Sequence, residues 1–184
     1  MTSLSDLANT LDVAIIGAGF SGTLVATHIL NQSQKPVRVG LFERDPRHFA
    51  RGVAYSSLMD CHLLNVPVGN MSAFPEDPGH FLRWAKVRQD YLIDPPWVEH
   101  LDARSFLPRR VYGDYLNSIL DEAEERSAPR HTLKRCIGKV KALKIQADTV
   151  YLELADESLF TAKLVVLALG NFPPGNPHPT HSEW

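Results

Sequence analysis

The sequence has few cysteines, no excess of basic charge and no long apolar run. Its 2 cysteines form no C-x-x-C pair, so the thiol–disulfide chemistry of flavin disulfide reductases is unsupported. Two cysteines so far apart in sequence also fit a reducing compartment, and we expect a cytoplasmic protein. A net charge of −2 shows no excess of basic residues of the kind that binds nucleic acid. The apolar runs fall short of the about 18 residues of a membrane span, and the polar N-terminus is unlike a signal peptide.

What remains is the composition of an ordinary globular protein. Hydrophobic residues make up 44% and charged residues 22% of the 184-residue chain. This length is enough for one domain with a sizeable core. We therefore expect a single domain over residues 1–184.

The most informative motif is a glycine-rich turn in residues 13–22, VAIIGAGFSG. An apolar run typical of a buried strand leads directly into the pattern G-x-G-x-x-G, and a helical pattern follows. Gly17 permits a tight turn, Gly19 lets a pyrophosphate approach the backbone, and Gly22 lets the helix pack closely on the sheet. The N–H groups of residues 19–22 and the helix dipole would then face negative charge.

An acidic residue follows at the spacing that dinucleotide sites use. A second apolar run, residues 37–42, ends in Glu43, about twenty residues after the last glycine. A carboxylate there binds a ribose diol and would repel a 2′-phosphate, so NADP is not expected in this site. The alternative is a glycine-rich turn in an α/β protein that binds no nucleotide.

Apolar periodicity predicts the remaining elements. The helical patterns cover residues 20–31, 78–89 and 110–126. Residues 44–75 lack periodicity but are too apolar for a disordered segment. Strands of a parallel sheet are expected at residues 12–17, 38–43 and 164–169. Short β patterns at residues 132–145, 149–154 and 159–161 predict an antiparallel meander at about 145–161.

The meander favours FAD as the bound dinucleotide. Nicotinamide dehydrogenases usually place a helix between their third and fourth parallel strands, where this sequence has β patterns. That order resembles the FAD domain of flavoproteins with a glutathione-reductase-like fold. Residues 167–170, LALG, are similar to the second motif of that group, with Leu169 where threonine is usual. We predict an α/β, Rossmann-like FAD-binding domain of the glutathione-reductase type: a parallel sheet with a β-meander and a helical insert at about 44–126.

Five further motifs narrow the resemblance. They are GVAYS at 52–56, LLNVP at 63–67, MSAFP at 71–75, HFLRW at 80–84 and PRRVYGDYL at 108–116. In this order they resemble the FAD/NAD(P)-binding domain of flavoproteins of the FAD-dependent urate hydroxylase and aspartate N-monooxygenase type. The resemblance implies an NAD(P)H-dependent monooxygenase that hydroxylates a small-molecule substrate. It also implies that this chain is the N-terminal part of a longer flavoprotein.

The resemblance implies a set of cofactor-binding residues as well. Glu43 would hold the adenosine ribose with Arg44 beside the adenine, and Val140, on the strand before the meander, would contact adenine through its backbone. The loop of residues 65–74 would lie near the isoalloxazine ring. No catalytic residue is assigned, because the cofactor makes and breaks the bonds. The full set is Gly17, Gly19, Phe20, Ser21, Gly22, Glu43, Arg44, Asn65, Met71, Val140 and Gly170.

Two motifs of such flavoproteins are missing from the sequence. There is no second glycine-rich motif for the nicotinamide nucleotide and no late Gly-Asp for the ribityl chain, since Gly113-Asp114 falls at a helix start. A missing C-terminal region or a partner chain would have to supply them. The alternative function is therefore a non-catalytic nucleotide- or flavin-binding fragment. No metal site is expected from His178, His181 and Glu183, because such a site would need regular spacing on one element, and Pro177 and Pro179 argue against that element.

Three polar groups each allow two interpretations. Arg109 and Arg110 either meet a phosphate or are solvated residues at a helix start. Asp60 and His62 are either an acid–base pair or surface residues, and flavin hydroxylation needs no such pair. Cys61 is either a redox thiol or a buried or incidental cysteine.

Overall fold

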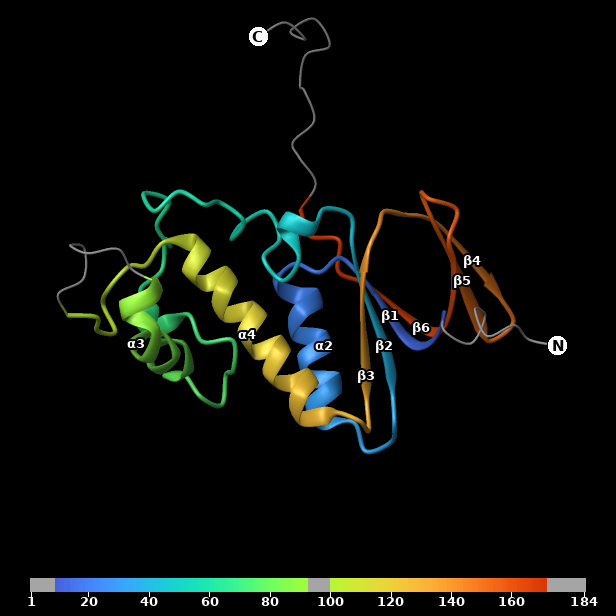
Figure 1. Cartoon of the computed structure of the whole chain (residues 1–184), viewed down its shortest axis with the longest axis horizontal. Coiled ribbons are helices and arrows are strands. Elements are labelled where there is room, and N and C mark those ends of the chain that lie inside the picture. Colours follow the sequence, from blue (N-terminus) through green and yellow to red (C-terminus); the bar gives the residue numbers. More distant parts are fainter. Residues whose placement is uncertain (1–8, 93–99, 172–184) are drawn as a thin grey trace, which may run out of the picture.

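The computed structural model describes residues 9–92 and 100–171. In this part of the chain a six-stranded mixed sheet, whose last strands form the meander, has helices on one side of its parallel part (Figure 1). The strand order is β3-β2-β1-β6-β5-β4, with the first four strands parallel and the last two pairings antiparallel. The predicted α/β fold with a meander is confirmed. The strands are β1 (Thr10–Ile16), β2 (Arg38–Glu43), β3 (Thr132–Ile137), β4 (Val140–Gln146), β5 (Thr149–Leu154) and β6 (Leu159–Leu167).

Two helices cover one face of the parallel strands. Helix α2 (Phe20–Gln32) connects β1 to β2, and α4 (Arg109–Ser127) leads into β3. They lie beside each other on the same side of the sheet (Figure 1). Leu30 of α2 and Leu120 and Ala123 of α4 are buried in one core with β1 and β2. The end of α4 therefore belongs to the sheet layer, although the sequence placed all of it in the insert.

The meander covers the opposite face. Leu152 and Leu154 of β5 share a core with Phe42 of β2 and Cys136 of β3. Phe42 and Phe160 meet edge to face, with ring centroids 5.0 Å apart. Aromatic pairs in this geometry stabilise a core beyond their buried area. The end of β2, which carries Glu43, is thereby fixed from both faces.

The segment between β2 and α4 has its own aromatic core. It contains η1 (Pro46–His48), η2 (Val68–Asn70) and α3 (His80–Leu92), which packs on the first half of α4. His80 Nδ1 lies 2.8 Å from the Tyr115 hydroxyl, which also accepts from the Ala73 N–H at 3.2 Å. Trp84 Nε1 donates to Ser118 Oγ at 2.5 Å. The buried aromatic members are Phe81, Trp84, Tyr112 and Tyr115.

Two strand assignments from the sequence were wrong. Residues 132–145 form two strands, because the chain turns at Gly138, whose N–H donates to the Glu43 carbonyl at 2.8 Å. The patterns at 159–161 and 164–169 form one strand, β6, which pairs with β5 over its first half and with β1 from Thr161 to Leu167. The meander consequently begins at Val140, and α3 begins at His80 rather than 78.

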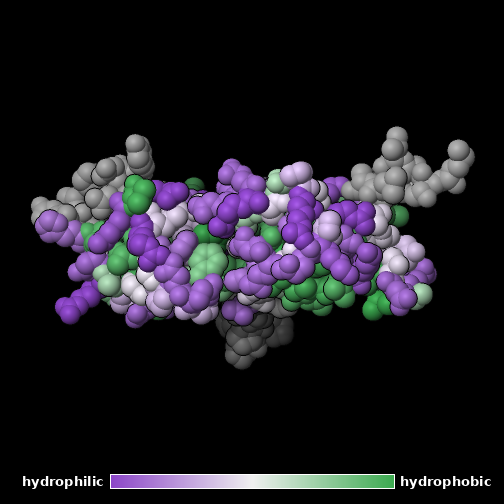
Figure 2. Space-filling view, turned by 90° about the horizontal axis from the view of Figure 1, so that it is seen from below, coloured by the Kyte–Doolittle hydropathy of each residue, from purple (hydrophilic) through white to green (hydrophobic). Residues whose placement is uncertain are grey.

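The surface seen from below is mostly hydrophilic over the helical half, and hydrophobic side chains gather in the half that contains the sheet (Figure 2). Leu164 and Leu167 of β6 are 64% and 60% exposed. In the described part of the chain, no helix is long and apolar enough to cross a membrane.

Candidate functional site

The first and third glycines of the turn are required by the fold itself. Gly17 has φ +103°, and a Cβ there would lie 2.2 Å from the Ala168 carbonyl oxygen. A Cβ on Gly22 would lie 1.8 Å from the Gly17 carbonyl oxygen. Both contacts are shorter than atoms allow, so the turn and the end of β6 pack only around glycine.

Gly19 differs from the other two. Its φ of −77° and ψ of −163° suit any residue, and a Cβ there would make only an ordinary contact, 3.4 Å from Gly52 Cα. The packing of the protein therefore does not require glycine here, and the space beside Gly19 is open. Gly19 is also the N-cap of α2 and offers no side-chain cap.

The start of α2 therefore presents uncapped donors. Among the described residues, no acceptor is bonded to the backbone N–H of Phe20, Ser21 or Gly22. Unpaired N–H groups and the positive end of the helix dipole form an anion site. We call the glycine turn of residues 17–22, with these donors at the start of α2, the cradle. It fits the pyrophosphate of a dinucleotide, as the glycine spacing predicts.

Glu43 joins the end of β2 to this cradle. The residue is only 9% exposed, and Oε2 accepts from the Ala18 N–H at 3.2 Å. Oε1 accepts from the N–H groups of Arg44 at 2.9 Å and Asp45 at 3.2 Å. Within the described residues, backbone donors rather than a cation hold this carboxylate. The carboxylate is thereby fixed beside the glycine turn.

The structure places three other predicted residues around this edge of the sheet. Arg44 is exposed directly after Glu43. Val140 lies at the start of β4, two residues beyond the Gly138 N–H that binds the Glu43 carbonyl. It is therefore on the first meander strand, not on the strand before the meander. Gly170 has φ +68° and lies two residues after Ala168, whose carbonyl oxygen faces Gly17.

The predicted isoalloxazine loop packs largely on the core of the insert. Asn65 is exposed, whereas Met71 and Phe74 contact the aromatic cluster of α3 and α4. The Phe74 ring lies 4.8 Å from the His80 ring and 6.0 Å from the His28 ring of α2. That this loop also faces the flavin stays a prediction.

Hydrogen exchange tests this prediction. FAD should slow amide exchange at Asn65 and Val66 as well as at residues 17–22, because a bound ring would shield them. Val68 and Gly69 serve as internal controls, since their N–H groups already bind the carbonyls of Ser105 and Ala103. Protection confined to the glycine turn would leave the loop a packing role only.

Sequence reasoning missed the contact that closes the cradle. Gly52 has φ +58°, and its Cα packs against Gly19. An ion pair between Arg51 and Asp114 holds the segment against α4, and Arg51 Nη1 also donates to the Arg110 carbonyl at 3.2 Å. The GVAYS motif contained the signal, because its glycine occupies a left-handed conformation.

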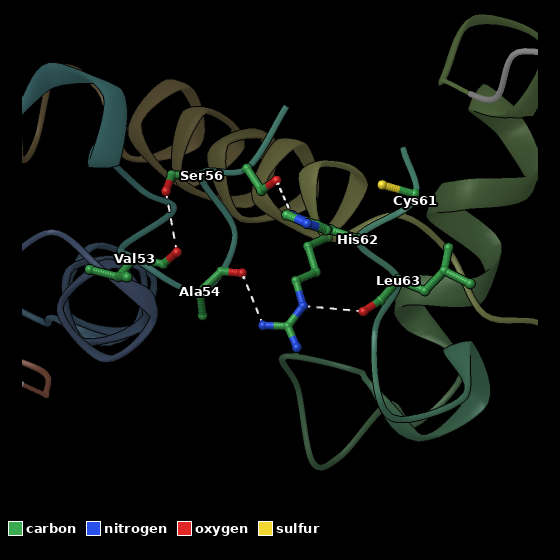
Figure 3. Close-up of a pocket in the computed structure, with 8 residues that line it drawn as sticks. Val53, Ala54, Ser56, Cys61, His62 and Leu63 are labelled. Atoms are coloured by element: carbon green, nitrogen blue, oxygen red, sulfur yellow. Dashed lines mark hydrogen bonds between the residues drawn. The ribbon is translucent and has the colours of Figure 1, made fainter. Parts of the chain in front are cut away.

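A hollow of about 620 Å³ is formed by residues that follow Gly52 in the chain and by the start of α4 (Figure 3). It is lined by Val53, Ala54, Ser56, Ser57, Cys61, His62, Leu63 and Arg109. Asp60 pairs with Arg110, and His62 Nδ1 lies 2.6 Å from Ser57 Oγ, so Asp60 and His62 form no acid–base pair. Arg109 faces this hollow and has a different environment from Arg110.

The cysteines and possible metal ligands give no further site. Cys61 is exposed and not buried, whereas burial raises the pKa of the Cys136 thiol to about 11. Among the described residues no group of three or more histidine, cysteine or acidic side chains is placed to hold a metal. His178, His181 and Glu183 lie outside these residues.

The fold and the cradle define a dinucleotide-binding domain of the class found in flavoproteins. Residues 14–172 match the FAD-NAD(P)-binding family, and the chain belongs to that family. It is an FAD/NAD(P)-binding domain that resembles those of flavin monooxygenases. No curated protein is similar enough in sequence to count as a match.

Solved structures share the fold. Cyclohexanone monooxygenase from Rhodococcus sp. Phi1, bound to NADP+, has a TM-score of 0.55 and 20% identity, with 90% of this chain and 28% of that chain covered. The flavin-containing monooxygenase of Stenotrophomonas maltophilia gives 0.50 and 18%, covering 87% and 38%. The bacillithiol disulfide reductase of Staphylococcus aureus gives 0.56 and 12%, covering 88% and 39%. The chain thus spans less than half the length of these proteins.

Proposed function

We propose that this chain is the FAD-binding part of an NAD(P)H-dependent monooxygenase that hydroxylates a small molecule, of the urate hydroxylase and aspartate N-monooxygenase type. The observation that carries the proposal is the uncapped start of α2, with open space at Gly19 and the fixed Glu43 carboxylate beside it. The order of the sequence motifs supports the assignment to this type.

The residues of the cradle suit distinct parts of FAD. The N–H groups of Phe20, Ser21 and Gly22 would bind the pyrophosphate, and Glu43 would accept from the ribose hydroxyls. Val140 would offer its backbone to the adenine. Bound FAD would supply the redox chemistry, taking a hydride from NAD(P)H and reacting with O₂. The protein's part is to bind and orient the cofactor.

The reaction would also need polypeptide beyond this chain. Along residues 163–167, β6 has no partner strand on its β5 side within the described part of the chain. Leu164 and Leu167 on this segment are mostly exposed. An unpaired strand edge with exposed leucines favours pairing with another strand. A C-terminal region or a partner chain would therefore complete the sheet and supply the nicotinamide site.

Flavin binding and turnover test these two parts separately. The purified chain should bind FAD saturably, which a fluorescence titration measures, but it should not oxidise NADH or NADPH at an enzymatic rate. Hydride transfer requires a nicotinamide held over the flavin, and no second motif in the sequence holds one. Absence of saturable FAD binding would refute the proposed function. Steady turnover by the chain alone would show that it contains a nicotinamide site.

A further inference from the structure

The hollow beside the start of α4 has a mixed lining that resembles neither a core nor a plain surface. Val53 and Leu63 give it apolar walls and are 72% and 48% exposed. Ser57, His62 and Arg109 give it polar groups. The hollow begins one residue after Gly52, which touches Gly19, so it lies beside the nucleotide cradle.

Arg109 is fixed in the wall of this hollow. Its Nε donates to the Leu63 carbonyl at 3.1 Å and its Nη1 to the Ala54 carbonyl at 3.5 Å. Its backbone N–H donates to the His62 carbonyl at 2.8 Å. The two chain segments thus hold the guanidinium between Ala54 and Leu63, as the dashed lines in Figure 3 show. A guanidinium held in this way has lost much of the rotamer freedom that binding would otherwise cost.

The charge of Arg109 is not neutralised by a carboxylate in the described part of the chain. Arg51 and Arg110, by contrast, are each paired with a carboxylate, Arg51 with Asp114 and Arg110 with Asp60. The carbonyl oxygens that hold Arg109 are neutral, and Arg109 is also the first residue of α4, where the helix dipole is positive. The positive charge of Arg109 also acts on Tyr55: burial raises the pKa of the Tyr55 hydroxyl, and the Arg109 charge opposes that rise.

His62 adds a second polar group to the same wall. Its Nδ1 lies 2.6 Å from Ser57 Oγ, which fixes the ring. When the Ser57 hydroxyl donates to Nδ1, the hydrogen of the neutral ring is on Nε2, which is then a donor. Arg109 and His62 therefore offer donors to one ligand, with Val53 and Leu63 as an apolar surface for the rest of it.

We propose that this hollow binds the anionic group, a carboxylate or a phosphate, of a small molecule through Arg109 and His62. A planar guanidinium recognises both oxyanions by paired hydrogen bonds. The site is separate from the pyrophosphate cradle at residues 17–22, so it does not depend on flavin binding. A carboxylate would belong to an organic acid substrate, and a phosphate to a second nucleotide.

Calorimetric titration with benzoate and with inorganic phosphate tests the site without FAD. The wild-type chain should bind at least one of them saturably, and Arg109→Gln should weaken that binding at least about tenfold, the effect of losing a charge-assisted hydrogen bond. Arg130→Gln is the matched control, because it removes the same charge from an exposed position beyond the other end of α4. It should leave the affinity unchanged.

Each outcome decides the proposal. Stronger binding of benzoate indicates an organic acid, and stronger binding of phosphate indicates a nucleotide. Saturation by neither anion, or equal affinity in Arg109→Gln, would overturn the site. If Arg109→Gln loses the circular dichroism spectrum of a folded protein, the wild-type chain is titrated with the same anions and followed by NMR instead. The proposal then requires shifts of the His62 signals. Shifts confined to other residues would overturn the site. FAD titration of the same samples reports on the proposed function independently.

Discussion

Replacement of Gly19 by valine should remove FAD binding from a protein that remains folded. The backbone there lies in a region that valine adopts readily, and a Cβ would meet nothing closer than Gly52 Cα at 3.4 Å. The added methyl groups would instead occupy the space beside the uncapped N–H groups of α2, which the pyrophosphate needs. We expect Gly19→Val to weaken FAD binding by more than about a hundredfold, or about 2.7 kcal/mol.

The matched control is the third glycine of the same motif. A Cβ on Gly22 would overlap the Gly17 carbonyl oxygen, so Gly22→Ala should destabilise the fold by about 3 kcal/mol or more. Gly19→Ala, the smallest change at the cradle, should keep the wild-type unfolding temperature and weaken FAD binding less than valine does. Thermal unfolding without ligand and fluorescence titration with FAD measure the two properties. Normal flavin content in Gly19→Val would show that the turn has only a structural role.

The sequence predicted best the elements whose patterns are local. Strand β2 was predicted at 38–43, as observed, because a continuous apolar run ends there in an acid. Helices α2 and α4 were predicted within one residue at each end, since their apolar faces recur at helical spacing. The order of strand, glycines, helix, strand and acid also matches the observed β1, glycine turn, α2 and β2 with Glu43 at its end.

Contacts between distant segments could not be predicted. Residues 44–75 have no periodicity, so the approach of Gly52 to Gly19 and the pairing of Arg51 with Asp114 were missed. The division of β3 from β4 depends on a hydrogen bond from Gly138 to Glu43, far away in sequence. Arg109 and Arg110 are adjacent and chemically identical, and only the fold gives one a carboxylate and the other a hollow.

Glu43→Ala should weaken FAD binding about ten- to a hundredfold, because hydrogen bonds to a charged group are worth about 1.5 to 3 kcal/mol. The structure adds a second effect. The Glu43 carboxylate is the acceptor for the N–H groups of Ala18, Arg44 and Asp45, and the first of these belongs to the glycine turn. The alanine variant should therefore also lose about 1 to 3 kcal/mol of folding stability without ligand.

Conservative variants separate the two effects. Glu43→Asp keeps the charge on a shorter side chain and should lose less of both properties than alanine. Glu43→Gln keeps the length of the side chain, and its amide oxygen can still accept a hydrogen bond. Its NH₂ group would face a backbone N–H, however, so this variant should also lose folding stability. Glu125→Ala removes an exposed acid from α4 and is the control for charge alone. Denaturant unfolding gives the stabilities and FAD titration the affinities. If Glu43→Ala bound FAD as tightly as wild type while losing stability, Glu43 would serve only to hold the turn, and the ribose would need another acceptor.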